Sequence, residues 1–228
     1  MPSYSGVWTL TAQYQAQGAS NWPSPPPSVI GQAYGGGYYA GQISTSANGV
    51  ATHYLIVADK TVGQAYGKQW GPSPATTGFT SLIDGPTNSA GEAALGSTYQ
   101  AATFCENLNT GGYTDWYLPA WNELEVLYYF LKPSTTINNT LSGSNANAVS
   151  PEPISTDYTT GSPPQTSATS FRTDAVTNSQ EFALEDYWAS SELNSTRGYI
   201  RSFLNGDAAT QTKTVVTYYT RAIRRIPV

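Results

Sequence analysis

The sequence is poor in the residues that carry redox and acid–base chemistry. Its 228 residues include one cysteine, Cys105, one histidine, His53, and one methionine, Met1. A single cysteine excludes an intramolecular disulfide and leaves the cellular compartment open. A catalytic triad would have to use His53, yet no Gly-x-Ser-x-Gly nucleophile elbow accompanies it. We therefore expect His53 to be a hydrogen-bonded structural residue and Cys105 to be a small core residue.

Charge is also scarce. Charged residues make up 11% of the chain, against about 25% in ordinary domains. The net charge is −5, and three of the ten basic residues, Arg221, Arg224 and Arg225, lie in one short stretch. Because phosphate binding needs a basic face, nucleic acid is excluded as an expected partner. The surface must be covered by neutral hydroxyls, amides and tyrosines, which suits a protein in an assembly or one that faces carbohydrate.

Long apolar runs and secretion signals are missing as well. No run of about 18 apolar residues exists to cross a bilayer, so we expect no membrane insertion. The stretch from Met1 to Gly6 lacks the basic and apolar regions of a signal peptide. For a protein that works outside a cell, release by lysis inside a particle would satisfy both facts.

Residues 1–30 differ in composition from the rest of the chain. A short apolar patch at 7–10 is followed by four prolines between Trp22 and Ser28. Consecutive prolines favour an extended, semi-rigid conformation. We expect an extended N-terminal attachment or oligomerisation segment with a proline-rich connector, and the alternative is a surface arm packed on its own domain.

Residues 31–228 have the pattern of one α+β domain. Apolar side chains at helical spacing predict two helices, over 97–108 and 120–132, the second well buried and stopped by Pro133. Alternating or β-branched runs predict strands at 38–43, 53–59, 187–192, 199–204 and 213–226. The polar stretch 134–161 is interpreted as a surface insertion. The glycine triplet 35–37 is not a phosphate-binding loop, since no helix-opening pattern follows it.

Three motifs occur in order in the second half of the chain. They are Gly112-Tyr113-Thr114-Asp115-Trp116-Tyr117-Leu118-Pro119 with Glu123-Leu124, then Tyr187-Trp188-Ala189-Ser190-Ser191-Glu192, then Tyr219-Thr220-Arg221-Ala222-Ile223-Arg224-Arg225-Ile226. Together they resemble the Lcl C-terminal domain family of C-type-lectin-like domains, which is abundant in phage tail proteins and bacterial surface proteins. The resemblance covers roughly residues 35–228, including Tyr38 to Ile43 and Asp84-Gly85-Pro86.

The resemblance implies a C-type-lectin-like fold, with two helices and a small, twisted, mainly antiparallel sheet. Trp116 and Trp188 are expected to anchor its core. The other structural motif positions are Leu118, Pro119, Glu123, Leu124, Glu192, Arg221 and Arg224.

Two positions of the motifs carry their own expectations. Glu192 is expected to be buried, where it hydrogen-bonds backbone amides of a neighbouring loop or pairs with a terminal arginine. Family members often have Ser or Thr where this chain has Ala120, which cannot cap the following helix. Asn122 or water would then serve the free amides of that helix.

Metal and glycosidase chemistry find little support in the sequence. Lectins of this broad fold often bind sugar through calcium, but the Glu-Pro-Asn and Gln-Pro-Asp signatures are absent, and Glu152-Pro153-Ile154 departs from the first. Asp84, Asn88 and Asp115 are candidates for a structural calcium ion, the one cofactor considered. The carboxylates that a glycan-degrading activity could pair are Asp157, Asp174, Glu181, Glu185 and Asp186.

The resemblance implies a non-enzymatic virion protein of a phage tail fibre or baseplate that binds a host cell-surface glycan or protein. Its ligand-facing surface is expected between the second and third motifs, at Asn194, Ser195, Arg197, Tyr199, Asn205, Asp207, Thr210, Gln211 and Lys213. The alternative is a purely structural subunit that contacts other virion proteins, and a glycan-degrading enzyme is the third hypothesis. Tail appendages are commonly trimeric, so a homotrimer organised by residues 1–30 is expected.

Overall fold

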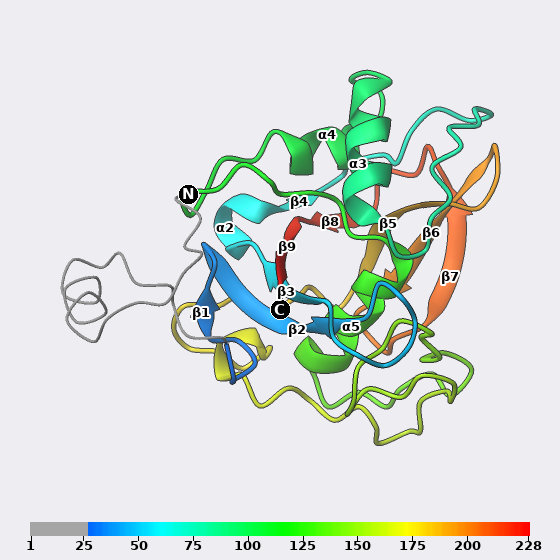
Figure 1. The fold of residues 1–228 in the computed structure, drawn as a ribbon. Coiled ribbons are helices and arrows are strands. Elements are labelled where there is room, and N and C mark those ends of the chain that lie inside the picture. The colour runs from blue at the N-terminus through cyan, green and yellow to red at the C-terminus, as the bar shows by residue number, and fades with distance from the viewer. Residues whose placement is uncertain (1–26) are drawn as a thin grey trace.

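The computed structural model describes residues 27–228 as a mixed α+β protein with few helices and two curled sheets (Figure 1). The predicted attachment segment at 1–30 lies outside the described residues except for its last four. No helix in the described part is long and apolar enough to cross a membrane.

The first sheet has four antiparallel strands in the order β1 (Ala33–Tyr34), β2 (Gly37–Ile43), β3 (His53–Val57) and β9 (Ile223–Pro227). Gly35 and Gly36 join β1 to β2 in a two-residue turn with φ of 58° and 83°. Positive φ at both positions is the requirement of a type I′ hairpin turn, and it explains why glycines stand there. The strands predicted at 38–43 and 53–59 are confirmed, although the second ends at Val57.

The second sheet has five strands in the order β4 (Gln64–Tyr66), β8 (Tyr219–Arg221), β5 (Asp186–Glu192), β6 (Arg197–Ser202) and β7 (Ala208–Thr212). Neighbouring strands are antiparallel, apart from the contact of β5 with β8. The chain passes between the two sheets at Ala222, whose N–H and carbonyl bond to Gly63 and Ala58. The prediction of one strand over 213–226 is therefore wrong, because β8 and β9 lie in different sheets. The prediction of a single sheet is also wrong, since the strands form two sheets.

Four helices are present in the described chain: α2 (Lys60–Gly63), α3 (Gly85–Ala94), α4 (Gln100–Glu106) and α5 (Trp121–Leu131), with a short 3₁₀ turn at Thr169–Phe171. The two predicted helices are confirmed as α4 and α5, although α4 is shorter than 97–108. The prediction missed α3, which has little apolar periodicity. Asp84 begins α3 by accepting a hydrogen bond from the Thr87 N–H, and Pro86 occupies its first turn.

The core divides into two clusters of buried side chains. The first gathers Leu124, Leu127 and Leu131 of α5 against β2, β5 and β6. The second contains Trp116 and Trp188, both confirmed as buried, together with a third tryptophan, Trp70. Cys105 lies in this second cluster as a fully buried core residue, as expected.

The segment 134–161 has no helix or strand, as expected, but it is not a loosely attached surface insertion. Buried positions recur along it, at Ser134, Asn138, Ser142, Asn145, Asn147, Ala148, Glu152 and Tyr158. Asn145 Nδ2 bonds to the Asn122 carbonyl, and Asn147 Nδ2 bonds to the Ser44 carbonyl. Because polar side chains replace apolar anchors here, the hydrophobicity of the sequence understates how much of the segment is interior.

Candidate functional site

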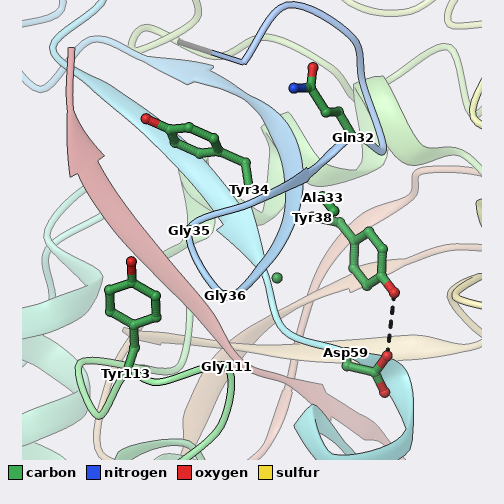
Figure 2. Close-up of a pocket in the computed structure, with 10 residues that line it drawn as sticks. Gln32, Ala33, Tyr34, Gly35, Gly36, Tyr38, Asp59, Gly111 and Tyr113 are labelled. Atoms are coloured by element: carbon green, nitrogen blue, oxygen red, sulfur yellow. Dashed lines mark hydrogen bonds between the residues drawn. The ribbon is translucent and has the colours of Figure 1, made fainter. Parts of the chain in front are cut away.

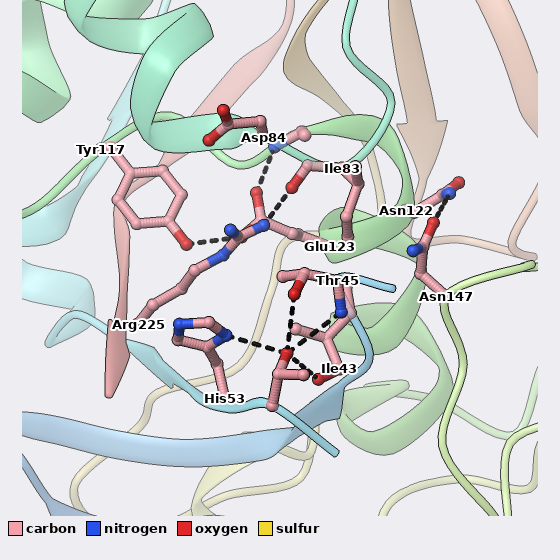
Figure 3. A network of polar contacts seen from close by, with 12 residues as sticks. Ile43, Thr45, His53, Ile83, Asp84, Tyr117, Asn122, Glu123, Asn147 and Arg225 are labelled. Carbon is pink, nitrogen blue, oxygen red and sulfur yellow. Dashed lines mark hydrogen bonds and ion pairs between the residues drawn. The ribbon is translucent and has the colours of Figure 1, made fainter. Parts of the chain in front are cut away.

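The first and third sequence motifs meet at the buried carboxylate of Glu123 on α5 (Figure 3). This carboxylate accepts hydrogen bonds from the Ala120 N–H at 2.8 Å and from the Tyr117 hydroxyl. Arg225 of β9 pairs with it, with 2.6 Å between Nε and Oε1. Burial raises the pKa of Glu123, although the Arg225 charge counteracts this. The first and third motifs are thus joined by an ion pair.

A second ion pair joins the same two motifs. Arg224 Nε and Nη2 bind the two oxygens of Asp115, each at 2.7 Å. The guanidinium also lies 3.6 Å from the centre of the Tyr113 ring. Its third nitrogen donates to the Gly35 carbonyl at 2.8 Å. A planar guanidinium with a bidentate carboxylate and an aromatic partner is held rigidly, so Arg224 fixes the β1–β2 turn to the 112–116 loop.

Arg221 is buried between the two sheets. It donates twice to the Ala58 carbonyl, at 3.0 and 2.8 Å, and once to Gln64. Burial lowers the pKa of Arg221 to about 10, which leaves the guanidinium charged at neutral pH. The three C-terminal arginines therefore have structural roles.

Glu192 ends β5 in the interior and binds the backbone of a neighbouring loop. Its carboxylate accepts from the Thr77 N–H at 3.0 Å and the Gly78 N–H at 2.9 Å, and it pairs with Lys213. The expected amide contacts are confirmed, while the charged partner is a lysine and not a terminal arginine. The assignment of Lys213 to the ligand-facing surface is wrong, because its side chain is fully buried and its Nζ lies 4.5 Å from the centre of the Trp70 ring.

The second motif supplies the cap of α5. Ser191 Oγ accepts from the Trp121 N–H at 3.0 Å and donates to the Ser81 carbonyl at 2.7 Å. Ala120 indeed has no capping side chain, but the expectation that Asn122 serves the free amides is wrong. The Asn122 side chain instead donates to Asn147 at 2.6 Å (Figure 3).

The residues expected to face a ligand do not form one surface. Arg197, Tyr199 and Thr210 point to the same face of the β6–β7 hairpin, because Tyr199 pairs with Thr210 and strand residues alternate. Arg197 is exposed and donates to Thr210 Oγ1 at 3.1 Å. Gln211 points to the opposite face, since it pairs with Gly198.

Several of the expected ligand residues instead form the turns at the two ends of the hairpin. Asn194 Oδ1 accepts from the N–H groups of Thr196 and Arg197, next to the half-exposed Ser195. At the other end Asn205 Oδ1 accepts from the Asp207 N–H at 3.1 Å. Asp207 in turn accepts from Asn139 at 2.6 Å. The two turns are separated by a whole strand, so one small ligand cannot contact both.

Sequence reasoning missed Trp121 as a member of the hairpin face. Its ring lies 4.5 Å from the ring of Tyr199, and the Arg201 guanidinium lies 5.0 Å from the same indole. Both Trp121 and Tyr199 are half-buried. No separate signal marked it in the sequence, since Trp121 falls at the same helical spacing as the buried Leu124 and Leu131. We call Trp121, Arg197, Tyr199 and Thr210 the hairpin face.

The candidates for acid–base chemistry lie in different surroundings. His53 Nδ1 bonds to Thr52 Oγ1 at 2.9 Å, in keeping with a hydrogen-bonded structural histidine (Figure 3). Burial and the charge of Arg225 lower the pKa of His53. Of the carboxylates, Glu181 pairs with Lys60 at 2.6 Å, and burial raises the pKa of Asp186. The remaining acidic candidates are exposed: Asp157, Asp174 and Glu185.

The three candidate calcium ligands have other partners. Asp84 caps α3, Asn88 donates to the Ser81 carbonyl at 2.7 Å, and Asp115 is paired with Arg224. Within residues 27–228 no group of three or more His, Cys, Asp or Glu side chains is arranged to hold a metal ion.

No protein-family model matches the chain, and no curated protein matches its sequence.

Proposed function

We propose that the chain is a virion protein of a phage tail fibre or baseplate, and that its C-type-lectin-like domain binds a receptor on the host cell without turning it over. The proposal is supported by the packing of the three motifs. Asp115 and Glu123 of the first motif pair with Arg224 and Arg225 of the third. Ser191 of the second motif caps the helix of the first. Residues that carry the resemblance thus act together as one scaffold.

The hairpin face is the surface that we propose for receptor binding. Trp121 and Tyr199 offer a rigid aromatic pair, held by ring contact and by the buried Arg201 beneath the indole. Arg197 and Thr210 add hydrogen-bonding groups at its side. Rigid aromatic area next to adaptable polar groups is the combination that recognition surfaces use, because little conformational entropy is lost on binding. A host cell-surface glycan or protein is the proposed partner.

Adsorption to cells tests the receptor function. The purified full chain, labelled at its N-terminus, is mixed with a panel of bacterial strains, and bound protein is measured by flow cytometry. We expect binding to one or a few strains. The double variant Arg197→Ala, Tyr199→Ser should bind at least about tenfold more weakly, since central aromatic and arginine side chains carry most interface energy. The matched control is Thr214→Ala, at an exposed position outside the hairpin face.

The other outcomes separate the remaining hypotheses. Absence of binding to every strain, with co-purification in a virion subassembly, would favour a purely structural subunit. Release of reducing sugar from envelope polysaccharide would favour a glycan-degrading enzyme. Cell binding that the double variant leaves unchanged would remove the hairpin face from the proposal. A homotrimer organised by residues 1–30 is tested by light scattering of the full chain against a chain that starts at Gly31, and a monomeric mass in both would contradict it.

A further inference from the structure

We propose a second binding site, for a small apolar carboxylate of the size of a short fatty acid, in a pocket between Lys68 and the outer face of α4. The pocket has a volume of about 380 Å³, within the range of roughly 300–1,000 Å³ that small-ligand sites occupy. We call it the Lys68 pocket, after the charged residue in its lining. It shares no residue with the hairpin face, so it goes beyond the proposed receptor site and does not depend on it.

The side chains of α4 that line the Lys68 pocket converge because they share one face of the helix. Gln100, Phe104 and Asn107 line the pocket at spacings of four and three residues, which places them one above another. Ala102 and Cys105 lie on the opposite face and enter the second core cluster. The pocket thus follows the outer face of α4 along its length.

Lys68 is held beside the first turn of α4 by its neighbour in the chain, Gln69. The Gln69 N–H donates to Gln100 Oε1 at 3.3 Å, and the Gln69 carbonyl accepts from the Ala101 N–H at 3.1 Å. Gln69 Nε2 also donates to the Thr98 carbonyl at 2.9 Å. Main-chain and side-chain bonds therefore fix Lys68 at the Gln100 end of the pocket.

Lys68 stands out among the basic residues because it has no counter-charge. The chain has ten lysines and arginines, all of them within residues 27–228. Lys68 is the one for which residues 27–228 supply neither an ion pair nor a side-chain hydrogen bond, whereas each of the others has a partner there. Hydrogen bonds between an ammonium group and a carboxylate are stronger than neutral ones. The free ammonium group therefore favours an anionic ligand.

The other end of the Lys68 pocket is apolar. Phe104 and Leu108 line it, and both are half-buried and pack on the second core cluster. Because the core holds their inner sides, their outer sides offer apolar area with little rotamer freedom left to lose on binding. An α-helix rises about 6 Å over the four residues from Gln100 to Phe104. A carboxylate that carries an apolar body of about that length matches both ends.

The nearest acidic side chain on α4 does not oppose an anion in the pocket. Glu106 follows Phe104 by two positions and interacts with Ser89 of α3. Burial raises the pKa of Glu106 there, which reduces its negative charge. Lys68 is therefore the charge that a ligand in the pocket meets.

The hollow at the β1–β2 turn lacks such convergence (Figure 2). Tyr34 and Tyr38 both line it, but the register of the hairpin places them on opposite faces. Its carboxylate, Asp59, already accepts hydrogen bonds from Thr61 and Gln180. The Lys68 pocket instead combines a free charge with apolar side chains on one helix face.

Saturation-transfer difference NMR on the full chain tests the class of ligand. The probes are hexanoate, its neutral analogue hexanamide, the cation hexylamine, and acetate, which has the charge without the apolar body. We expect a saturable signal from hexanoate and binding about two- to fivefold weaker for hexanamide, the value of one half-exposed charge pair. Hexylamine and acetate should give none. No saturable signal from hexanoate, or equal affinity for hexanoate and hexanamide, overturns the proposal.

Two pairs of variants locate the binding. Asn107 lines the pocket and is exposed, so Asn107→Trp fills the pocket without entering the core, and Asn109→Trp at an exposed position outside the lining is its matched control. We expect Asn107→Trp to weaken hexanoate binding at least about tenfold through lost pocket volume, and Asn109→Trp to leave it unchanged. Lys68→Gln should abolish the preference for hexanoate over hexanamide, and Lys68→Arg should keep it.

The same titrations separate the Lys68 pocket from the hairpin face. The double variant Arg197→Ala, Tyr199→Ser should keep its affinity for hexanoate. Equal binding by wild-type protein and Asn107→Trp, or loss of hexanoate binding in the hairpin variant alone, overturns the pocket as the site while leaving receptor binding by the hairpin face untouched.

Discussion

Lys213 and Glu192 form an ion pair with side chains 0% and 1% exposed. The pair joins the end of β5 to the residue that follows β7, and Thr77 and Gly78 donate to the same carboxylate. Burial raises the pKa of Glu192, but the hydrogen bonds from Lys213, Thr77 and Gly78 outweigh it, and the net shift is downward. The pair thus holds the loop that contains Thr77 and Gly78, before α3, against the second sheet.

Replacement of Lys213 should be severely destabilising. Lys213→Met leaves the Glu192 carboxylate buried without its cation, and breaking such a pair costs about 3–5 kcal/mol of unfolding free energy. Urea denaturation at pH 7 measures it, with Lys68→Met at a half-exposed lysine as control. The added change Glu192→Gln should recover part of the loss. A loss below about 1 kcal/mol, the level of a surface pair, would contradict this account.

Adjacent serines of β5 should differ in their contribution to stability. Ser191 Oγ caps α5 and also bonds to the Ser81 carbonyl, so Ser191→Ala should lower the unfolding free energy by about 1–2 kcal/mol. Ser190 Oγ is buried without a hydrogen-bond partner. Because an unpaired buried hydroxyl is unfavourable, Ser190→Ala should be neutral or stabilising. Thermal unfolding of both variants checks the difference, and equal losses would argue against the cap.

Glu125 should make stability depend on pH. It pairs with Arg201 in the interior, and burial raises the pKa of Glu125 to about 7, against the opposing charge of Arg201. The folded state therefore binds more protons than the unfolded state between about pH 4.3 and 7, and this contribution to stability falls as pH rises through that window.

The variant Glu125→Gln lacks this titration. Relative to that of the wild type, its unfolding free energy should rise by up to about 3 kcal/mol between pH 4 and pH 8. Urea denaturation of both proteins at four pH values measures the gain. A difference between the two proteins that does not change with pH would show that Glu125 keeps its ordinary pKa.

Two glycines with nearly the same backbone angle should respond differently to alanine. Gly36 and Gly112 have φ of 83° and 82°. Gly112→Ala meets no atom within 4 Å, so it should cost only the conformational strain, about 1–2 kcal/mol. Gly36→Ala carries the same strain and also clashes with Tyr113 and Gly111. Its loss of unfolding free energy should be larger by about 1 kcal/mol or more. Chemical denaturation measures both. Equal losses would mean that the β1–β2 turn and the Gly111–Tyr113 loop move apart at no cost in free energy.

The elements that the sequence predicted well are those with strong apolar patterns. The helix α5 and the strands β2 and β3 were recognised because their apolar side chains repeat at helical or strand spacing and pack in the two core clusters. The strand β7 (Ala-Ala-Thr-Gln-Thr) and the helix α3 have no such pattern. They form because β7 pairs with β6 and because Asp84 and Pro86 begin α3. Pairing and capping are contributions that apolar periodicity does not register.

The candidate site was predictable only in part for a similar reason. Sequence order placed Arg197, Tyr199 and Thr210 in one region, and strand pairing brought them to one face. Lys213 was assigned to the same surface, yet its charge is neutralised in the interior by Glu192. Whether a lysine is exposed depends on a partner 21 residues away in the chain. A local sequence pattern contains no information about a partner so far away in the chain.

By itself, the sequence determined the α+β class, the burial of Trp116, Trp188 and Cys105, and the scarcity of charge, because these follow from composition and from apolar spacing along a continuous segment. Only the tertiary structure decided the split into two sheets, the buried ion pairs, the cap that Ser191 lends to α5, and the pocket between Lys68 and α4. Each of these joins segments far apart in the chain, and their energies depend on distance and on exclusion of water, which exist only once the chain has folded.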